Sequence, residues 1–121
     1  MFEELQIIHE IAKSNSPNII ELIETFEDND CYYVVTKFMQ AGDLFNYITK
    51  QQETPLRESF TKKLIYQVCQ GVQALHSRNI VHRDIKLENI LMSSFAEDAQ
   101  LRIADLGSAF KLESAEDKTR F

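Results

Sequence analysis

The stretch from 82 to 89, HRDIKLEN, constrains this chain more than any other feature of its sequence. It places a carboxylate (Asp84), an ammonium group (Lys86) and a side-chain amide (Asn89) in one short loop. Such a loop can hold a hydroxyl nucleophile, a phosphoryl group and a metal ion close together. A second acidic cluster, Asp105-Leu106-Gly107, follows it. Together the two clusters supply the residue types that phosphoryl transfer needs.

The residues before this loop predict a helix and then a hairpin. An apolar stripe at helical spacing predicts a helix over 2–12. The run SNSPN at 14–18 is expected to end that helix. Two runs with strand character follow, at 19–26 and 31–38, and the residues between them, 27–30, are expected to form a hairpin turn.

The residues around and after the loop complete an α+β order. The segment AGD at 41–43 is expected to end the second strand and to cap a short helix at 44–50. Apolar residues that recur at spacings of three and four predict a long helix from about 58 to 77. The segment from 111 to 121 is charged and has no apolar period. Short strands are expected at 80–81, 90–92 and 101–103.

HRDIKLEN together with Asp105-Leu106-Gly107 resembles the catalytic loop and the metal-binding triplet of the eukaryotic protein kinases. The resemblance implies an α+β fold that is part of the protein-kinase fold. It implies one partial kinase domain over residues 1–121. Residues 1–38 would supply a helix and two strands of the small lobe. Residues 39–121 would supply the hinge, the first helices of the large lobe, the catalytic loop, the Asp-Leu-Gly triplet and the start of the activation loop.

The resemblance implies catalytic roles for Asp84 and Lys86. Asp84 is expected to accept the proton of a substrate hydroxyl and to orient that hydroxyl towards the γ-phosphate of ATP. Lys86 is expected to offer a point charge to the transferring phosphoryl group. Asn89 and Asp105 provide hard oxygen ligands for one or two Mg²⁺ ions that bridge the phosphates. His82 is expected to pack in the core under the loop.

The resemblance also assigns the ATP site. Its positions are the gatekeeper Thr36, then Lys37, Met39, Asp43, Glu88, Leu91 and Ala104. The backbone of Lys37 and Met39 is expected to bond the edge of the adenine, with Leu91 beneath the ring and Ala104 beside it. Asp43 and Glu88 stand where basophilic kinases hold substrate arginines, which favours protein substrates with basic residues near the phosphosite. A surface position, or a helix cap for Asp43, would also explain these carboxylates, and core packing would also explain Thr36 and Leu91.

Four positions are expected to regulate such a site: Glu4, Arg83, Leu106 and Thr119. Glu4, with Glu3 as its rival, is expected to hold the ATP-binding lysine of a kinase. Leu106 stands where the family usually has Phe, so altered packing rather than lost chemistry is expected. The expected neighbours of Leu106 are Ile8, Leu22 and His82.

Arg83 and Thr119 are expected to form a phosphorylation switch. Thr119 lies fourteen residues after Asp105, in the part of the chain that resembles an activation loop. A phosphate there would bring charge and acceptor oxygens that Arg83 can bind. Ser108 and Ser114 are rival phosphosites, and a carboxylate is the alternative partner of Arg83.

Two further observations bear on the class of kinase. Lys86, two residues after Asp84, is typical of serine/threonine kinases, and Leu87 is common in the calcium/calmodulin-dependent group. The sequence contains no GxGxxG loop, and it does not reach the Gly-Thr-Pro and Ala-Pro-Glu motifs of a kinase domain. The favoured interpretation is a fragment of a working kinase. The alternatives are a catalytically inactive kinase-like binding or decoy module and, less favoured, a small-molecule phosphotransferase.

Composition argues against other classes of protein. The net charge of −6 argues against a general nucleic-acid binder. No apolar stretch approaches the ~20 residues that a membrane-spanning helix needs. Cys31 and Cys69 fit no metal spacing and are expected to be reduced thiols in a cytoplasmic protein. The sequence predicts ATP and Mg²⁺ as cofactors and does not indicate the oligomeric state.

Overall fold

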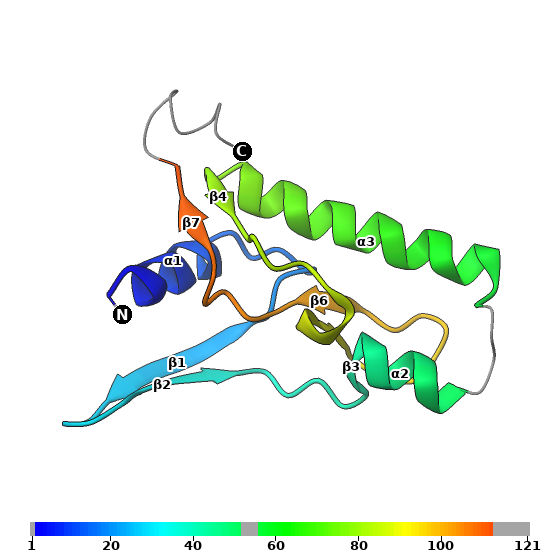
Figure 1. Ribbon diagram of the computed structural model, residues 1–121, viewed down its shortest axis with the longest axis horizontal. Helices are drawn as coiled ribbons and strands as arrows, with labels where there is room; N and C mark the ends of the chain where they lie inside the picture. The colour runs from blue at the N-terminus through cyan, green and yellow to red at the C-terminus, as the bar shows by residue number, and fades with distance from the viewer. Residues whose placement is uncertain (1, 52–55, 113–121) are drawn as a thin grey trace.

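The chain contains helices and short strands, with a group of strands on each side of the consecutive helices α2 and α3 (Figure 1). The computed structural model describes residues 2–51 and 56–112. The elements, in chain order, are α1 (Phe2–Ala12), β1 (Leu22–Glu27), β2 (Tyr32–Thr36), β3 (Gly42–Asp43), α2 (Leu44–Gln51), α3 (Glu58–His76), β4 (Ile80–Val81), the 3₁₀ turn η1 (Leu87–Asn89), β5 (Ile90–Met92), β6 (Leu101–Ile103) and β7 (Phe110–Lys111).

The described strands form small antiparallel sheets. β1 and β2 form a hairpin, β5 lies between β3 and β6, and β4 pairs with β7. In Figure 1 the hairpin projects on one side of the β3–β5–β6 sheet, and α3 runs along the other side. α2 packs against η1 and β5. The 82–89 loop, which connects β4 to β5, therefore lies in the middle of the molecule.

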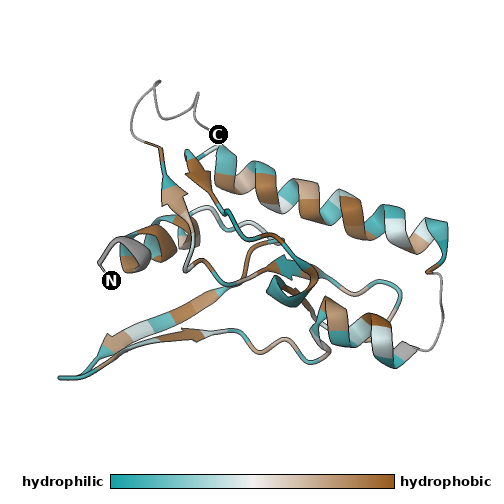
Figure 2. Cartoon of the chain, in the orientation of Figure 1, coloured by the Kyte–Doolittle hydropathy of each residue, from teal (hydrophilic) through white to brown (hydrophobic). Residues whose placement is uncertain are grey.

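The core lies between α3 and the central sheet. Its largest fully buried side chains are Leu75, Ile80, Met92, Leu101 and Ile103. Figure 2 shows hydrophobic residues recurring along α3 and filling β4. Gly71 allows α3 to approach β6, because a Cβ at this position would lie 2.7 Å from Ile103 Cδ1 and 2.8 Å from Asn18 O. Each fully buried aliphatic side chain contributes about 1.5–3 kcal/mol, so this contact is a main source of stability.

The loop after α1 is anchored to this core by Asn18, a buried polar residue. Its side-chain Nδ2 donates hydrogen bonds to Leu101 O (2.9 Å) and to Gln67 Oε1 (3.2 Å). The backbone of Leu101 donates to the same Gln67 oxygen (2.8 Å). The backbone of Ile103 donates to Asn18 O (2.9 Å). The loop, α3 and β6 are thus joined by one satisfied polar network, as a buried amide requires.

The predicted helices are confirmed. The first spans 2–12 as predicted, and the other two end within one residue of the predicted ends. The hairpin turn at 27–30 is also confirmed, since Asp28 accepts hydrogen bonds from the backbone of Asp30 (2.9 Å) and Cys31 (2.8 Å). The three predicted short strands, 80–81, 90–92 and 101–103, are β4, β5 and β6.

Two strand boundaries were predicted wrongly. β1 begins at Leu22 rather than at 19, because Ile19 makes a parallel bridge to Ile103 of the central sheet instead. β2 ends at Thr36 rather than at 38, and Phe38 is 84% exposed. Phe38 was predicted to be part of a strand because it is apolar, although its side chain is exposed to solvent.

The segment at 41–43 does not end the second strand. Gly42 and Asp43 form β3, which pairs with Met92 and Leu91 of β5. The chain reaches this position by a turn in which Gly42 N donates to Met39 O (3.0 Å) and Gly42 takes a φ of +72°. Glycine adopts this left-handed conformation without steric cost.

β7 was not among the predicted strands. It pairs with β4, so its partner is about thirty residues away in the sequence.

Cys31 and Cys69 are free and exposed. Among the helices of residues 2–51 and 56–112, none combines the length and the apolar character needed to cross a membrane.

Candidate functional site

The 82–89 loop is built on a buried histidine. His82 is 3% exposed and lies directly after β4. The backbone N–H of Asp84 donates to His82 Nδ1 (3.1 Å), so Nε2 carries the ring proton and donates to Ala104 O (2.8 Å). His82 therefore links the start of the loop to the residue before Asp105. The expectation that His82 packs in the core under the loop is confirmed.

Inside the loop, Asn89 holds Asp84. The Nδ2 group of Asn89 donates to Asp84 Oδ2 (3.0 Å) and to Asp84 O (2.9 Å). Lys86 Nζ lies 3.6 Å from the same Asp84 Oδ2. Asn89 is buried because η1 closes the loop, with Asn89 N donating to Lys86 O (3.0 Å). The carboxylate, the ammonium group and the amide that the sequence singled out are thus brought together.

The Asp-Leu-Gly triplet is attached directly to this loop. Ala104 N donates to Asn89 O (2.8 Å), which connects the residue before the triplet with the end of the loop. Asp105 has a φ of +55°, and Gly107 N lies 3.3 Å from its Oδ1. The Asp105 side chain is exposed, and Leu106 beside it is buried. The two clusters identified in the sequence are therefore neighbours in the fold.

Arg83 is the bulkiest residue of the described chain with a positive φ (+70°). Its Nε donates to Ser108 O (2.7 Å), and its guanidinium lies 5.3 Å from the centre of the Phe110 ring. A left-handed conformation is strained for a long side chain and persists where surrounding contacts hold it. These contacts place a cation between the 82–89 loop and the segment after the triplet.

Leu106 lies beside a small hollow. The hollow has a volume of about 180 Å³ and is lined by Ile8, Ile11, Ile20, Leu22, Val34, Thr36, Asp105 and Leu106. Leu106 therefore shares a cavity with two of its expected neighbours, Ile8 and Leu22. Thr36, the expected gatekeeper, shares it with Asp105. The first helix, the hairpin and the triplet thus meet at one apolar space.

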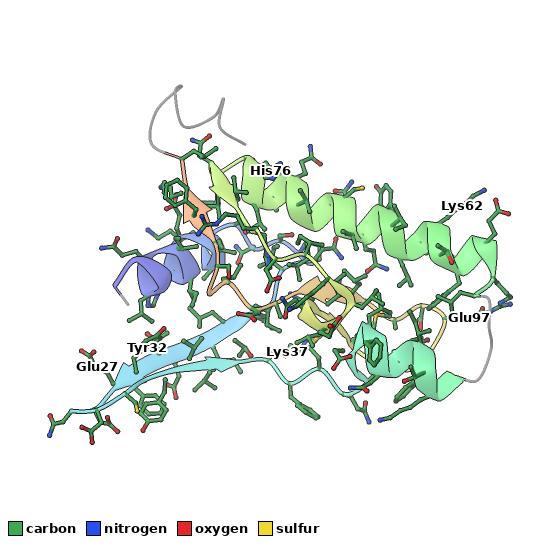
Figure 3. All side chains as sticks on the ribbon, in the orientation of Figure 1. Glu27, Tyr32, Lys37, Lys62, His76 and Glu97 are labelled. Carbon is green, nitrogen blue, oxygen red and sulfur yellow. The ribbon has the colours of Figure 1, made fainter. Side chains whose placement is uncertain are left out.

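The other positions assigned to ATP lie around the turn at 39–43 and the central sheet. Lys37 N donates to Glu21 O (2.9 Å), and Met39 is buried. Leu91 of β5 is paired with Asp43 on one side and Arg102 on the other. Figure 3 shows Lys37 on the segment that leads from β2 towards α2.

The carboxylates of Asp43 and Glu88 differ in their hydrogen bonds. Asp43 caps α2, because Asn46 donates to its Oδ1 from the backbone (2.8 Å) and to its Oδ2 from Nδ2 (2.9 Å). The helix-cap interpretation of Asp43 is therefore confirmed. Glu88, on η1, is exposed. Glu88 is thus the freer of the two negative charges beside the loop.

Two expected regulatory residues cannot be compared with the structure. Glu4 lies in α1, but its side chain is outside the described residues, and Thr119 is outside them altogether.

One contact was not predicted from the sequence: Lys111 Nζ lies 2.6 and 2.5 Å from the two carboxylate oxygens of Glu10. The two residues are 101 positions apart, and no local pattern pairs them.

The ligand set fits magnesium held together with phosphates better than an independent metal centre. In residues 2–51 and 56–112, no group of three or more His, Cys, Asp and Glu side chains is arranged for a metal ion. Mg²⁺ usually takes one or two protein oxygens and completes its shell with phosphate oxygens and water. Asn89 and Asp105, joined through the Ala104–Asn89 hydrogen bond, offer such a partial set.

Comparison with known proteins agrees with these motifs. Residues 1–121 match the family model described as the protein kinase domain. The phosphorylase b kinase gamma catalytic chain, liver/testis isoform, of Mus musculus is 35% identical over 113 residues, which cover 93% of this chain and 26% of that protein. Calcium/calmodulin-dependent protein kinase cmkA of Emericella nidulans is 37% identical over 114 residues, covering 94% of this chain and 26% of the relative.

A third relative, serine/threonine-protein kinase PLK4 of Nematostella vectensis, is 41% identical over 102 residues. That match covers 84% of this chain and 10% of the relative. The chain thus spans between 10% and 26% of the length of these three relatives. With a family match over its whole length and relatives above 30% identity, the chain belongs to the protein kinase domain family.

Proposed function

We propose that the protein containing this chain is a serine/threonine kinase that transfers the γ-phosphoryl group of Mg-ATP to a protein hydroxyl. The observation that carries this proposal is the arrangement around Asp84. Its carboxylate accepts a hydrogen bond from Asn89 and lies 3.6 Å from Lys86 Nζ. The same Asn89 is bonded through its backbone to Ala104, next to Asp105.

Asp84 is proposed to bind and orient the substrate hydroxyl. Asn89 and Lys86 both engage Oδ2, so we assign Oδ1 to the hydroxyl and to its proton. The bond from the side-chain Nδ2 of Asn89 to the backbone oxygen of Asp84 restrains the Asp84 backbone in addition. A restrained base avoids reorganisation when the reaction occurs.

Lys86 is proposed to stabilise negative charge on the transferring phosphoryl group. Its ammonium is half exposed and is shared with a single Asp84 oxygen at 3.6 Å, a long contact. A long, flexible side chain in such a contact can turn towards a more highly charged phosphate. The proposed role requires only this change of partner.

Asn89 and Asp105 are proposed to hold Mg²⁺ with the phosphates of ATP. Because Asn89 Nδ2 donates to Asp84, the amide oxygen Oδ1 is the atom of Asn89 that remains as a metal ligand. When bound, the ion would neutralise phosphate charge. This chain's own contribution is to keep the two oxygen ligands at the ends of neighbouring segments.

The adenine is proposed to lie against Thr36, Lys37, Met39, Leu91 and Ala104. Glu88 is proposed to attract basic residues of a protein substrate, because it is exposed beside the loop. Asp43 is a weaker candidate for that role, since Asn46 already engages both of its oxygens. Arg83, Thr119 and Glu4 keep the regulatory roles that the resemblance implies.

One observation favours a second candidate function for the 121 residues taken alone. Their three glycines, at 42, 71 and 107, do not form a GxGxxG loop over the phosphates. The chain alone is therefore proposed to be inactive in phosphoryl transfer. In that state it would act as a binding or decoy module.

The test is a transfer assay on the full-length protein with radiolabelled ATP, Mg²⁺ and a basic peptide containing serine. We expect phosphoserine, and we expect Asp84→Asn to lower kcat by at least ~10²-fold. Asp98→Asn, the same change at an exposed position outside the loop, is the control and should keep full activity. Equal kcat for Asp84→Asn and wild type would refute the assignment.

A further inference from the structure

Two side chains of helix α1, His9 and Glu10, make polar contacts with other elements. The helix packs mainly against β1, where His9 Nε2 lies 3.1 Å from Thr25 Oγ1. A second polar contact reaches a different part of the fold: both carboxylate oxygens of Glu10 bind Lys111 Nζ, at 2.6 and 2.5 Å. Figure 1 shows α1 beside β7, the strand that carries Lys111.

The strand that carries Lys111 is itself fixed to the catalytic-loop segment. β7 pairs with β4, the strand that leads into the 82–89 loop. Leu112 N donates to Asn79 O (2.7 Å) just before β4. Arg83 binds Ser108 O (2.7 Å) and covers the Phe110 ring, on the other side of the strand. The position of Lys111 is therefore tied to the position of the loop.

The Glu10–Lys111 pair is more buried than an ordinary surface ion pair. The side chains of Lys111 and Glu10 are 40% and 29% exposed, whereas those of Lys62 and Glu58, an ion pair on α3, are 75% and 83% exposed. Partial removal from water strengthens the attraction between opposite charges. Engagement of both carboxylate oxygens adds a directional component. An exposed pair such as Glu58–Lys62 contributes little by comparison.

Glu10 also has cationic residues near it besides Lys111. Glu10 lines a hollow together with Lys13 and Arg78, both cationic. Removing the carboxylate would leave Lys111 without this partner and would leave the lining of the hollow with two cations and no anion. The loss of Glu10 should therefore disturb α1 more than the loss of Lys111.

We propose that Glu10 and Lys111 are positioning residues that couple α1 to the catalytic loop through β7. The proposal rests on the proposed kinase function, because α1 also carries Glu4, the residue proposed to hold the ATP-binding lysine. With the pair formed, α1 is held against β7, and its position follows that of the loop. Without the pair, α1 is held by its apolar stripe and by β1, and it can shift without any change in the loop. Neither residue touches the substrate or ATP.

The first test measures kinetics in the full-length protein. Glu10→Gln should lower kcat about tenfold and Lys111→Met somewhat less, a coupling of the size usual between linked sites. KM for ATP and for peptide should change less than about twofold, because binding groups are untouched. Reversing the pair, with Glu10→Lys and Lys111→Glu together, should restore most of the lost kcat. Unchanged kcat in Glu10→Gln, or a reversed pair no better than the single variants, would overturn the proposal.

The control is the exposed pair on α3. Figure 3 shows Lys62 near the N-terminal end of α3, away from α1. Glu58→Gln and Lys62→Met remove the same kinds of charge without touching α1, and they should leave kcat unchanged. A similar loss of kcat in these variants would mean that charge alone, rather than the position of α1, is responsible, and the proposal would fail.

The second test does not depend on activity. Amide hydrogen exchange of α1 in full-length Glu10→Gln should be about tenfold faster than in wild type, with α3 unchanged. Unchanged exchange in α1, or an equal increase in α3, would overturn the coupling. If wild type transferred no phosphate but α1 exchange responded as expected, the proposed function would fail and the coupling would stand. If wild type were active and α1 did not respond, the coupling would fail and the function would stand.

Discussion

The 82–89 loop and helix α1 are held in place by different kinds of contact. The loop is fixed by hydrogen bonds within itself and to Ala104, the residue that follows β6, and these bonds are centred on His82 and Asn89. α1 is held by a stripe of buried isoleucines and by side-chain contacts to β1 and β7. The loop is therefore held by a hydrogen-bond network built on its own residues, whereas α1 is held mainly by apolar packing and by side-chain contacts to two strands. We infer that the loop is rigid and that its alignment with α1 is adjustable.

Removing His82 should disrupt the 82–89 loop, and it has the largest expected effect on stability. His82→Ala deletes a buried ring and leaves Asp84 N and Ala104 O without their shared partner. We expect a loss of about 3 kcal/mol in the free energy of unfolding, and a kcat at least ~10-fold lower. Thermal unfolding and the transfer assay on the full-length protein measure both.

His76→Ala is the control for this change. His76 is exposed at the end of α3, as Figure 3 shows, so its loss should leave both quantities near wild type. A His82→Ala protein as stable and active as the His76→Ala protein would contradict the view that the loop is fixed through His82.

The distance along the chain between contacting residues also determines which features the sequence could predict. The loop and the triplet were recognised because each is a cluster of no more than eight consecutive residues, and the helices because their apolar residues recur at regular spacing. The sequence allowed Asp43 to be either a helix cap or a carboxylate that binds substrate arginines. The hydrogen bonds from Asn46 show that it caps α2. Local patterns therefore carried most of the candidate site.

Contacts between distant segments could not be predicted. Nothing in the sequence pairs Glu10 with Lys111, or Asn18 with Gln67, since each pair depends on how whole elements pack. β7 was not predicted for the same reason, because its two residues, unlike the apolar pair Ile80–Val81, include a lysine and pair with a strand about thirty residues away. Phe38 was assigned to a strand on hydropathy, although the chain had already turned away from the sheet.

The hairpin against which α1 packs should show the smallest effect. Hydrogen bonds from the backbone of Asp30 and Cys31 and from the Tyr33 hydroxyl hold the pKa of Asp28 below its usual value of 3.8. A lowered pKa in the folded state stabilises the turn above pH 3.8, and this contribution disappears as the pH falls through the lowered value. Asp28→Asn should therefore slightly lower the unfolding temperature at neutral pH and make no difference in strong acid.

Asp30→Asn, in the same turn, is the matched comparison for this small effect. Unfolding temperatures of both variants and wild type between about pH 7 and the acid limit of folding would measure it. A difference between Asp28→Asn and wild type that grew as the pH fell would have the wrong sign for a lowered pKa and would contradict the account of this turn.

The central claim is that the 82–89 loop and the Asp-Leu-Gly triplet form one phosphoryl-transfer site. A double-mutant cycle on kcat of the full-length protein, with Asn89→Ala, Asp105→Ala and both together, tests it most directly. Residues that hold the same ion and phosphates act as a unit, so we predict that each single change lowers kcat by at least ~10²-fold and that the double change costs little more than the worse single one. Effects of the two substitutions that multiply in the double variant, or full activity in either single variant, would contradict a shared site.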